Sequence, residues 1–245
     1  MFSARRQTPQ TLLVSFSGID GAGKTTQISN LCSRLDQNRV SFRLVVFWDE
    51  VATLTHLREW SSHVLFKGDK GVGTPDRPVS RRDKNIQSWY MTVVRYFLYF
   101  LDAVSLRRMV TKVRQSGAQV IIFDRYVYDE LANLSPDDRS TRTFLRLLLK
   151  IAPRPDIAFL LDADPAEAYQ RKPEYPIEFL HHNRASFLAA SDVAAMTVIP
   201  PLATTKAAEK VLENVSKNLA LVPVAENVSA PNLASDFAPD TLSGE

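Results

Sequence analysis

The chain has 245 residues, of which 45% are hydrophobic and 23% charged, and its formal net charge is only +3. These values fit a globular domain with a core large enough for a parallel sheet, and they exclude a polycation that binds nucleic acid polymers. No run of about 18 apolar residues occurs, so we predict no membrane span. The single cysteine, Cys32, fits a reducing compartment, and we expect a cytoplasmic protein.

The chain begins with a strand–turn–helix–strand pattern. After a predicted flexible N-terminus (residues 1–10), the apolar run Leu12–Phe16 predicts a buried strand. A glycine-rich turn follows, and then Lys24–Asp36 has apolar residues at helical spacing. Phe42–Phe47 is a second apolar run with strand character, so these residues form a predicted βαβ unit.

The middle of the chain is predicted to contain a charged loop between helices. Val51–Phe66 has helical character, whereas Lys67–Lys84 combines three glycines and two prolines with an excess of three positive charges. We favour a solvated basic loop there, with an anion-gathering lid as the alternative. Asn85–Gln115 is predicted to form one long helix or two, and Val120–Phe123 a strand that ends at Asp124.

The last third continues the alternation of strands and helices. Ser135–Asp138 provides a capping serine, a proline at the first helical position and two acids, which predicts a helix to about Ile151. A strand is predicted at Ile157–Leu161, followed by a helix that leads to a charged turn at Arg171–Glu174. The last predicted elements are a helix at about Pro176–Ala190, a strand at Met196–Ile199 and a helix near Thr205–Leu219. Residues 221–245 are predicted to be a disordered tail.

Strands that alternate with helices predict an α/β fold. We expect three α/β/α layers around a five-stranded parallel sheet, in one domain that spans residues 11–220. The basic loop at residues 67–84 and the charged segment at about residues 171–184 are expected to belong to this domain.

One motif carries the chemistry. Residues 18–25 match the pattern G-x-x-x-x-G-K-[ST] of the P-loop, between a predicted strand and a predicted helix. Triphosphate oxygens must approach the backbone closely there, and converging N–H groups with the positive helix end bind them. We therefore predict ATP as the ligand. The expected nucleotide-binding residues are Gly18, Ile19, Asp20, Gly21, Ala22, Gly23, Lys24, Thr25 and Thr26.

A magnesium site is expected beside this loop. Lys24 should bridge the β- and γ-phosphates, and the Thr25 hydroxyl should bind Mg²⁺. Asp124 ends a buried strand and faces the ligand crevice, where its carboxylate could bind the same ion. An ordinary helix-capping role is the alternative for Asp124. Arg125, the next residue, suits a phosphate group.

These motifs resemble those of the thymidylate kinase family. The similar segments are Phe16–Gln27, the triplet Asp124-Arg125-Tyr126, and Leu161–Pro165 followed by Arg171. The resemblance implies a nucleoside monophosphate kinase that transfers the γ-phosphate of ATP to dTMP or a related monophosphate. Members of this family are commonly dimers, so a homodimer is possible.

The resemblance also implies roles for individual residues. Asp20 would contact the acceptor sugar or help to order the transferred phosphate, and Arg125 would contact the acceptor phosphate. Arg171, Lys172 and Arg184 would belong to the lid that covers the donor phosphates. Arg171 is our first choice for the γ-phosphate, and an exposed helix end is the alternative for each of the three.

The acceptor half departs from the family pattern. The family has Arg-Glu-Pro-Gly after its second strand, where this chain has Val46–Glu50 without an arginine. We therefore keep the hypothesis that Glu50 or Asp49 acts as a general base toward a hydroxyl acceptor, a nucleoside or a sugar, as in deoxynucleoside kinases. A regulatory protein that binds nucleotide without turnover is the third hypothesis. The aromatics of residues 89–100 are more often core than a base-stacking wall.

Overall fold

The structure, a computed structural model, describes residues 11–52, 89–132 and 139–219. Five parallel strands form one sheet in the order β2-β3-β1-β4-β5. Their bounds are β1 Leu12–Ser17, β2 Phe42–Val46, β3 Val120–Asp124, β4 Ile157–Leu161 and β5 Thr197–Ile199. The predicted five-stranded parallel sheet is therefore confirmed. Parallel strands need crossover connections, which place helices on the faces of the sheet.

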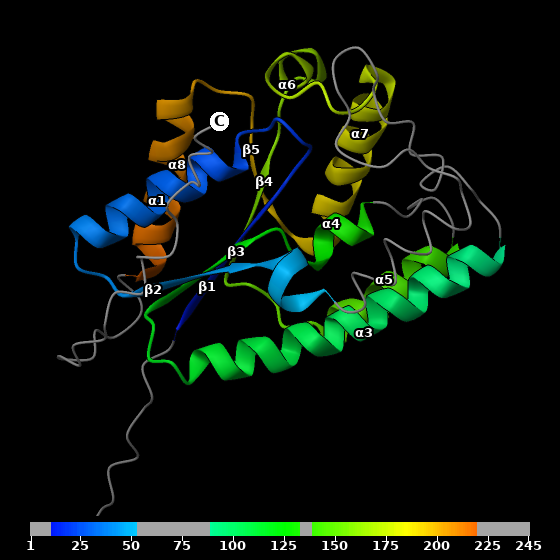
Figure 1. Cartoon of the computed structure of the whole chain (residues 1–245), viewed down its shortest axis with the longest axis horizontal. Coiled ribbons are helices and arrows are strands. Elements are labelled where there is room, and N and C mark those ends of the chain that lie inside the picture. The colour runs from blue at the N-terminus through cyan, green and yellow to red at the C-terminus, as the bar shows by residue number, and fades with distance from the viewer. Residues whose placement is uncertain (1–10, 53–88, 133–138, 220–245) are drawn as a thin grey trace, which may run out of the picture.

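Helices cover both faces of the sheet (Figure 1). The helices α1 and α8 lie on one face, and α3, α4, α5 and α7 lie on the other. The helices and the single π-helical turn have these bounds: α1 Lys24–Gln37, η1 Phe47–Val51, α3 Trp89–Arg114, α4 Val127–Leu131, α5 Arg139–Ile151, α6 Pro165–Arg171, α7 Ile177–Ala194 and α8 Thr204–Leu219. This arrangement confirms the three-layer α/β/α architecture.

Each face of the sheet has its own hydrophobic core. In β1, Leu12, Val14 and Phe16 point to the α1–α8 side, whereas Leu13 points to the side of α3 and α5. This alternation follows from the two-residue period of a strand. Ser17 therefore falls on the Leu13 side of the sheet, where α4 lies, and its side chain is fully buried.

Two local features differ from the sequence prediction. The second strand ends at Val46, one residue early, because Phe47–Val51 turn into η1. The short helix α4 after Tyr126 was not predicted. The predicted helix Val51–Phe66 begins at the last residue of η1, and from residue 53 onward it lies outside the described residues. The basic loop 67–84, the helix start at 135–138, the N-terminus and the tail also lie outside them. Among the helices that are described, none has the length and apolarity to cross a bilayer.

The topology places the site. The central strand β1 has β3 on one side and β4 on the other. The connection after β1 leads to β2 at one edge of the sheet, whereas the connection after β3 leads to β4 on the other side of β1. The carboxyl ends of such neighbouring strands form a crevice that binds ligands in open α/β sheets. The loops after β1, β3 and β4 meet at this edge.

Candidate active site

The glycine loop between β1 and α1 has a conformation that only glycine adopts easily. Gly18 and Gly21 have φ of 145° and 83°. A Cβ on Gly18 would lie 2.5 Å from the carbonyl oxygen of Leu161, and one on Gly21 would come closer than 3.0 Å to that of Ala168. The loop is thus pressed against the end of β4 and against α6, and both glycines are sterically required.

The start of α1 is built to receive an anion. Gly23 caps the helix in the left-handed conformation and offers no side-chain cap, and the first turn contains no acidic residue. The first N–H groups of a helix have no intrahelical partner, and the helix dipole adds positive potential there. This end of α1 fits a phosphate group, as the motif predicts.

Lys24 lies within the loop. Its ammonium group donates to the carbonyl oxygens of Gly18 at 2.8 Å and Ile19 at 2.9 Å, and the residue is 7% exposed. Burial, together with the positive charge of Arg125, lowers the pKa of Lys24 to about 8. A bound polyphosphate would add negative charge beside this buried ammonium group and so favour its charged form.

Arg125 reaches the glycine loop from β3. Its backbone has φ of 67°, and its N–H donates to the carbonyl of Phe16 at 3.0 Å. Its Nη2 is in direct contact with Oδ1 of Asp20, which lies 4.0 Å from the Lys24 Nζ. Burial alone would raise the pKa of Asp20, but Arg125 and Lys24 outweigh it and lower that pKa below its ordinary value. The structure thus brings three predicted catalytic residues together.

A buried carboxylate that was not predicted lies behind Arg125. Asp129 of α4 accepts from the Ser17 hydroxyl at 2.6 Å and from Arg125 Nη1 at 3.3 Å. It also caps its own helix by accepting from the N–H of Tyr126 at 3.3 Å. The acid three residues after the cap was the available signal in the sequence, since acids favour the first turn of a helix.

The predicted magnesium ligands lie at the same edge. Asp124 ends β3 in register with Phe16, two residues before the glycine loop begins. Thr25 is exposed in the first turn of α1. A hydroxyl and a carboxylate are hard oxygen donors of the kind that Mg²⁺ prefers, so these residues fit the ion.

The predicted lid residues divide into three different settings. Arg171, at the end of α6, donates to the carbonyl of Gly21 at 2.9 Å and to Glu167 at 2.8 Å. Lys172 is exposed and pairs with Glu174 at 3.2 Å. Arg184 of α7 binds both carboxylate oxygens of Asp162, at 2.6 and 2.7 Å. Of the three, only Arg171 hydrogen-bonds to the glycine loop.

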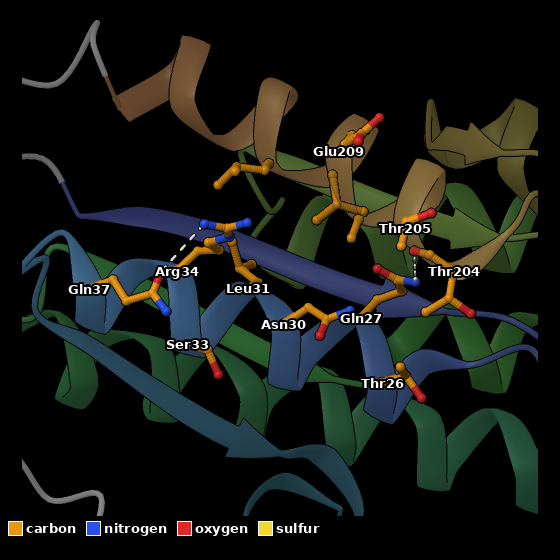
Figure 2. Close-up of a pocket in the computed structure, with 13 residues that line it drawn as sticks. Thr26, Gln27, Asn30, Leu31, Ser33, Arg34, Gln37, Thr204, Thr205 and Glu209 are labelled. Carbon is orange, nitrogen blue, oxygen red and sulfur yellow. Dashed lines mark hydrogen bonds between the residues drawn. The ribbon is translucent and has the colours of Figure 1, made fainter.

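A cavity of about 500 Å³ extends from the loop toward α8. It is bordered by Gly23 and Gln27, by Asp162 after β4, by Arg171, and by residues 200–204 between β5 and α8. Gln27 donates to the carbonyl of Thr204 at 3.1 Å and so ties α1 to this segment. A second hollow of about 510 Å³ continues along the groove between α1 and α8 (Figure 2). The first cavity is large enough for a nucleoside.

Glu50 is engaged outside this cluster. Its Oε2 lies 3.2 Å from Arg43 Nη2, and its Oε1 accepts from the N–H of Val46 at 3.2 Å. Asp49 is exposed in the same turn, η1. Because β2 is an edge strand and β3 separates it from β1, these acids follow a strand that is not adjacent to the glycine loop.

The aromatic residues of α3 do not all enter the core. Tyr99 is buried, and Tyr96 is half-buried and stacks on Phe144 of α5 with ring centroids 4.1 Å apart. Phe97 and Phe100 are 60% and 40% exposed, so the prediction that the stripe is core was wrong for these two residues. The side chain of Trp89 lies outside the described part of the molecule.

Comparisons with known proteins decide the family. No protein-family model matches the chain. A probable thymidylate kinase of Archaeoglobus fulgidus is 26% identical over 214 residues, which cover 84% of this chain and 93% of that protein. The thymidylate kinase of Chlorobium luteolum is 30% identical over 169 residues, 66% of each chain, and that of Solidesulfovibrio magneticus is 26% identical over 211 residues. The chain belongs to the thymidylate kinase family.

A solved thymidylate kinase supports the fold. The structure from Candida albicans superposes with a TM-score of 0.57 at 16% sequence identity, and covers 86% of this chain and 94% of the other. Such a distant likeness concerns the fold alone. The three thymidylate kinase-like segments of the sequence meet here at one edge of the sheet, where Arg125 contacts Asp20 and Arg171 contacts Gly21.

Proposed function

We propose that the protein is an ATP-dependent nucleoside monophosphate kinase that transfers the γ-phosphate of ATP to dTMP. The observation that carries the proposal is the convergence of Lys24, Asp20 and Arg125 at the glycine loop of a chain related to thymidylate kinases over most of its length. The products are ADP and dTDP. An oxygen of the dTMP phosphate forms the new bond to the γ-phosphorus, and the bond from that phosphorus to the β,γ-bridging oxygen breaks.

The donor is bound along the loop and the adjacent cavity. The N–H groups at the start of α1 and the Lys24 ammonium group bind the phosphates. The adenosine lies in the cavity between Gln27, Asp162 and residues 200–204. Arg171, already seated on the carbonyl of Gly21, needs only to exchange that acceptor for a γ-phosphate oxygen to neutralise the charge that develops during transfer.

The acceptor is bound on the Arg125 side. The Arg125 guanidinium group binds the dTMP phosphate and brings its oxygen in line with the γ-phosphorus. When the phosphate takes the Nη2 group of Arg125, the Asp20 carboxylate is released and can accept a hydrogen bond from the sugar. Positioning and charge neutralisation carry most of the rate enhancement in this class of reaction.

Magnesium is the ion that this donor set fits. Thr25 and Asp124 supply a hydroxyl and a carboxylate at the strand ends, and they would hold Mg²⁺ directly or through water. The ion, when bound, neutralises negative charge on the β- and γ-phosphates. The donor set supports this assignment, since hard cations prefer such oxygen ligands.

Two further features belong to this proposal. A homodimer is supported by an exposed apolar stripe on α3 in which Val93, Phe97 and Phe100 follow each other at helical spacing. A cytoplasmic location is supported by the single cysteine, because one thiol forms no internal disulfide.

A coupled assay of ADP release tests the proposal. ATP and Mg²⁺ are supplied with dTMP, with thymidine or without acceptor. We expect turnover with dTMP and at most trace turnover with the other two. Lys24→Ala should lower turnover by at least about a hundredfold, whereas Lys112→Ala, an exposed lysine of α3, should leave it unchanged. Turnover with thymidine alone, or ATP binding without acceptor-dependent turnover, contradicts the proposal.

A further inference from the structure

Arg125 is held by two carboxylates that differ in their surroundings. Its Nη2 contacts Asp20 and its Nη1 contacts Asp129. The side chain of Asp129 is 3% exposed, whereas that of Asp20 is 19% exposed and belongs to the loop that binds the donor. We therefore expect the two ion pairs to respond differently when a phosphate enters the site.

Asp129 is fixed by three elements at once. Its Oδ2 accepts from the Ser17 hydroxyl, at the end of β1, and from the N–H of Tyr126, just before α4. Its Oδ1 is thereby directed at Arg125, which follows β3. A buried carboxylate with a hydrogen bond from each of these elements has little freedom to move, because leaving them would leave polar groups buried and unpaired.

Asp20 is in a different position. Its partners are two side chains, Arg125 and Lys24, that both carry positive charge and both suit phosphate oxygens. A dianionic phosphate competes with a single carboxylate for these partners, so the Asp20 contact can be exchanged. The Asp129 contact lies on the other nitrogen of the same guanidinium group and is not in competition.

We propose that Asp129 is a positioning residue for the transfer reaction: it holds Nη1 of Arg125 so that Nη2, after release from Asp20, faces the acceptor phosphate. This inference rests on the proposed function, since it assigns the acceptor to Arg125. Arg125 also has a left-handed backbone conformation, so contacts with its neighbours are needed to hold it in place. A non-glycine residue at φ of 67° is conformationally costly and persists where its neighbours hold it.

The kinetic test compares Asp129→Asn with the wild type. The amide oxygen can still accept from Ser17 and Tyr126, but the charge opposite Arg125 is lost. We expect the KM for dTMP to rise about tenfold to a hundredfold, while the KM for ATP stays within about twofold. Ser17→Ala, which frees only one hydrogen bond to Asp129, should shift the KM for dTMP in the same direction by a smaller factor.

A double-mutant cycle separates positioning from a structural role. In an Arg125→Ala background, Asp129→Asn should add less than about twofold to the KM for dTMP, because the group that it positions is absent.

The matched control is Asp156→Asn. It removes the charge of a carboxylate that accepts from the N–H of Leu13 at 2.7 Å, at the opposite end of the strands. It should leave both KM values unchanged. Equal rises in both KM values for Asp129→Asn, with additive effects in the cycle, overturn the proposal.

A measurement without substrate keeps the proposal separate from the proposed function. In the full chain labelled with ¹⁵N-arginine, the side-chain signal that disappears in Arg125→Lys identifies Arg125. The measurement is made in an Asp20→Ala background, which removes the other carboxylate that contacts Arg125. In this background we expect slow rotation of the guanidinium group with Asp129 intact and with Asp156→Asn, and fast rotation with Asp129→Asn. If the wild type fails to phosphorylate dTMP, the proposed function fails, and the rotation of Arg125 still decides whether Asp129 holds it. Unchanged rotation on adding Asp129→Asn to Asp20→Ala overturns the inference.

Discussion

Gly21 of the glycine loop packs against the backbone of Ala168 in α6, with no room for a Cβ between them. This contact joins the glycine loop, where we propose that the donor binds, to the helix that carries Arg171. Gly21→Ala would meet both the steric conflict with Ala168 and a φ of 83° that disfavours alanine. We expect the affinity for ATP to fall at least about tenfold, because the loop or α6 must shift.

Gly117 offers a matched control for that substitution. It has φ of 78°, nearly the same as Gly21, but a Cβ there would meet no atom within 4 Å. Gly117→Ala should lower the free energy of unfolding by about 1–2 kcal/mol from backbone strain and leave ATP affinity unchanged. Calorimetric titration with ATP and thermal unfolding of both variants provide the measurements. Equal losses of ATP affinity in the two variants would show that the contact with Ala168 is unimportant.

Arg171 and its neighbour Lys172 should contribute very differently to turnover. Arg171 donates to the carbonyl of Gly21, whereas Lys172 is exposed and pairs with Glu174. We expect Arg171→Ala to lower kcat with dTMP by about a hundredfold, because the charge that develops on the γ-phosphate loses its counter-charge. Lys172→Ala should change kcat by less than about threefold. A larger decrease in kcat for Lys172→Ala than for Arg171→Ala would assign the contact with the γ-phosphate to Lys172 instead.

Glu50 should not be a catalytic base. Both of its carboxylate oxygens are occupied, one by Arg43 and one by the N–H of Val46. Glu50→Gln and Asp49→Asn are therefore expected to retain turnover with dTMP within about twofold, and the exposed ion pair should contribute at most about 1 kcal/mol to stability. Steady-state kinetics of both amides measure this. Loss of turnover with ATP binding intact would revive the hypothesis of a hydroxyl acceptor.

The strand, glycine loop and helix start of the P-loop motif could be predicted from the sequence because they are encoded locally. The spacing of Gly18, Gly23 and Lys24 specifies loop, helix start and ammonium group within one short segment, and apolar runs mark the strands around it. Asp129 escaped prediction because its role depends on Ser17, 112 residues earlier, and on Arg125 across a helix cap. Such a relationship arises only when β1 and β3 pair.

The same reasoning explains the error on the aromatic stripe. Phe97 and Phe100 have the spacing of buried residues, but the burial of a residue on a long helix depends on which neighbours cover each face. On α3 the sequence pattern alone does not distinguish a face that packs on the sheet from one that is exposed. The turn η1 was missed for a related reason, since Phe47 is buried as a strand residue would be.

The pH dependence should report on Lys24. Its pKa is about 8 in the free protein, lowered from the ordinary value by burial and by Arg125. Below pH 8 the ammonium form predominates and binds the phosphates. Above pH 8 the free protein increasingly holds a neutral amine, so kcat/KM for ATP should fall by up to about tenfold per pH unit. An initial-rate profile from pH 6.5 to 9.5 measures this, and a profile that stays flat through pH 9.5 would contradict it.

The exposed stripe on α3 predicts how the protein assembles. Phe97 is 60% exposed and Val93 57%, on a helix where neither is needed for the core. If the stripe joins two copies, Phe97→Asp should convert a dimer into a monomer, because a buried unpaired charge at the interface is strongly unfavourable. Light scattering after size exclusion should give twice the chain mass of 27.5 kDa for the wild type and the single chain mass for the variant.

Val193→Asp, at an exposed apolar position of α7, is the matched control and should remain dimeric. A monomeric wild type, or a Phe97→Asp variant that stays dimeric, removes this stripe as the interface.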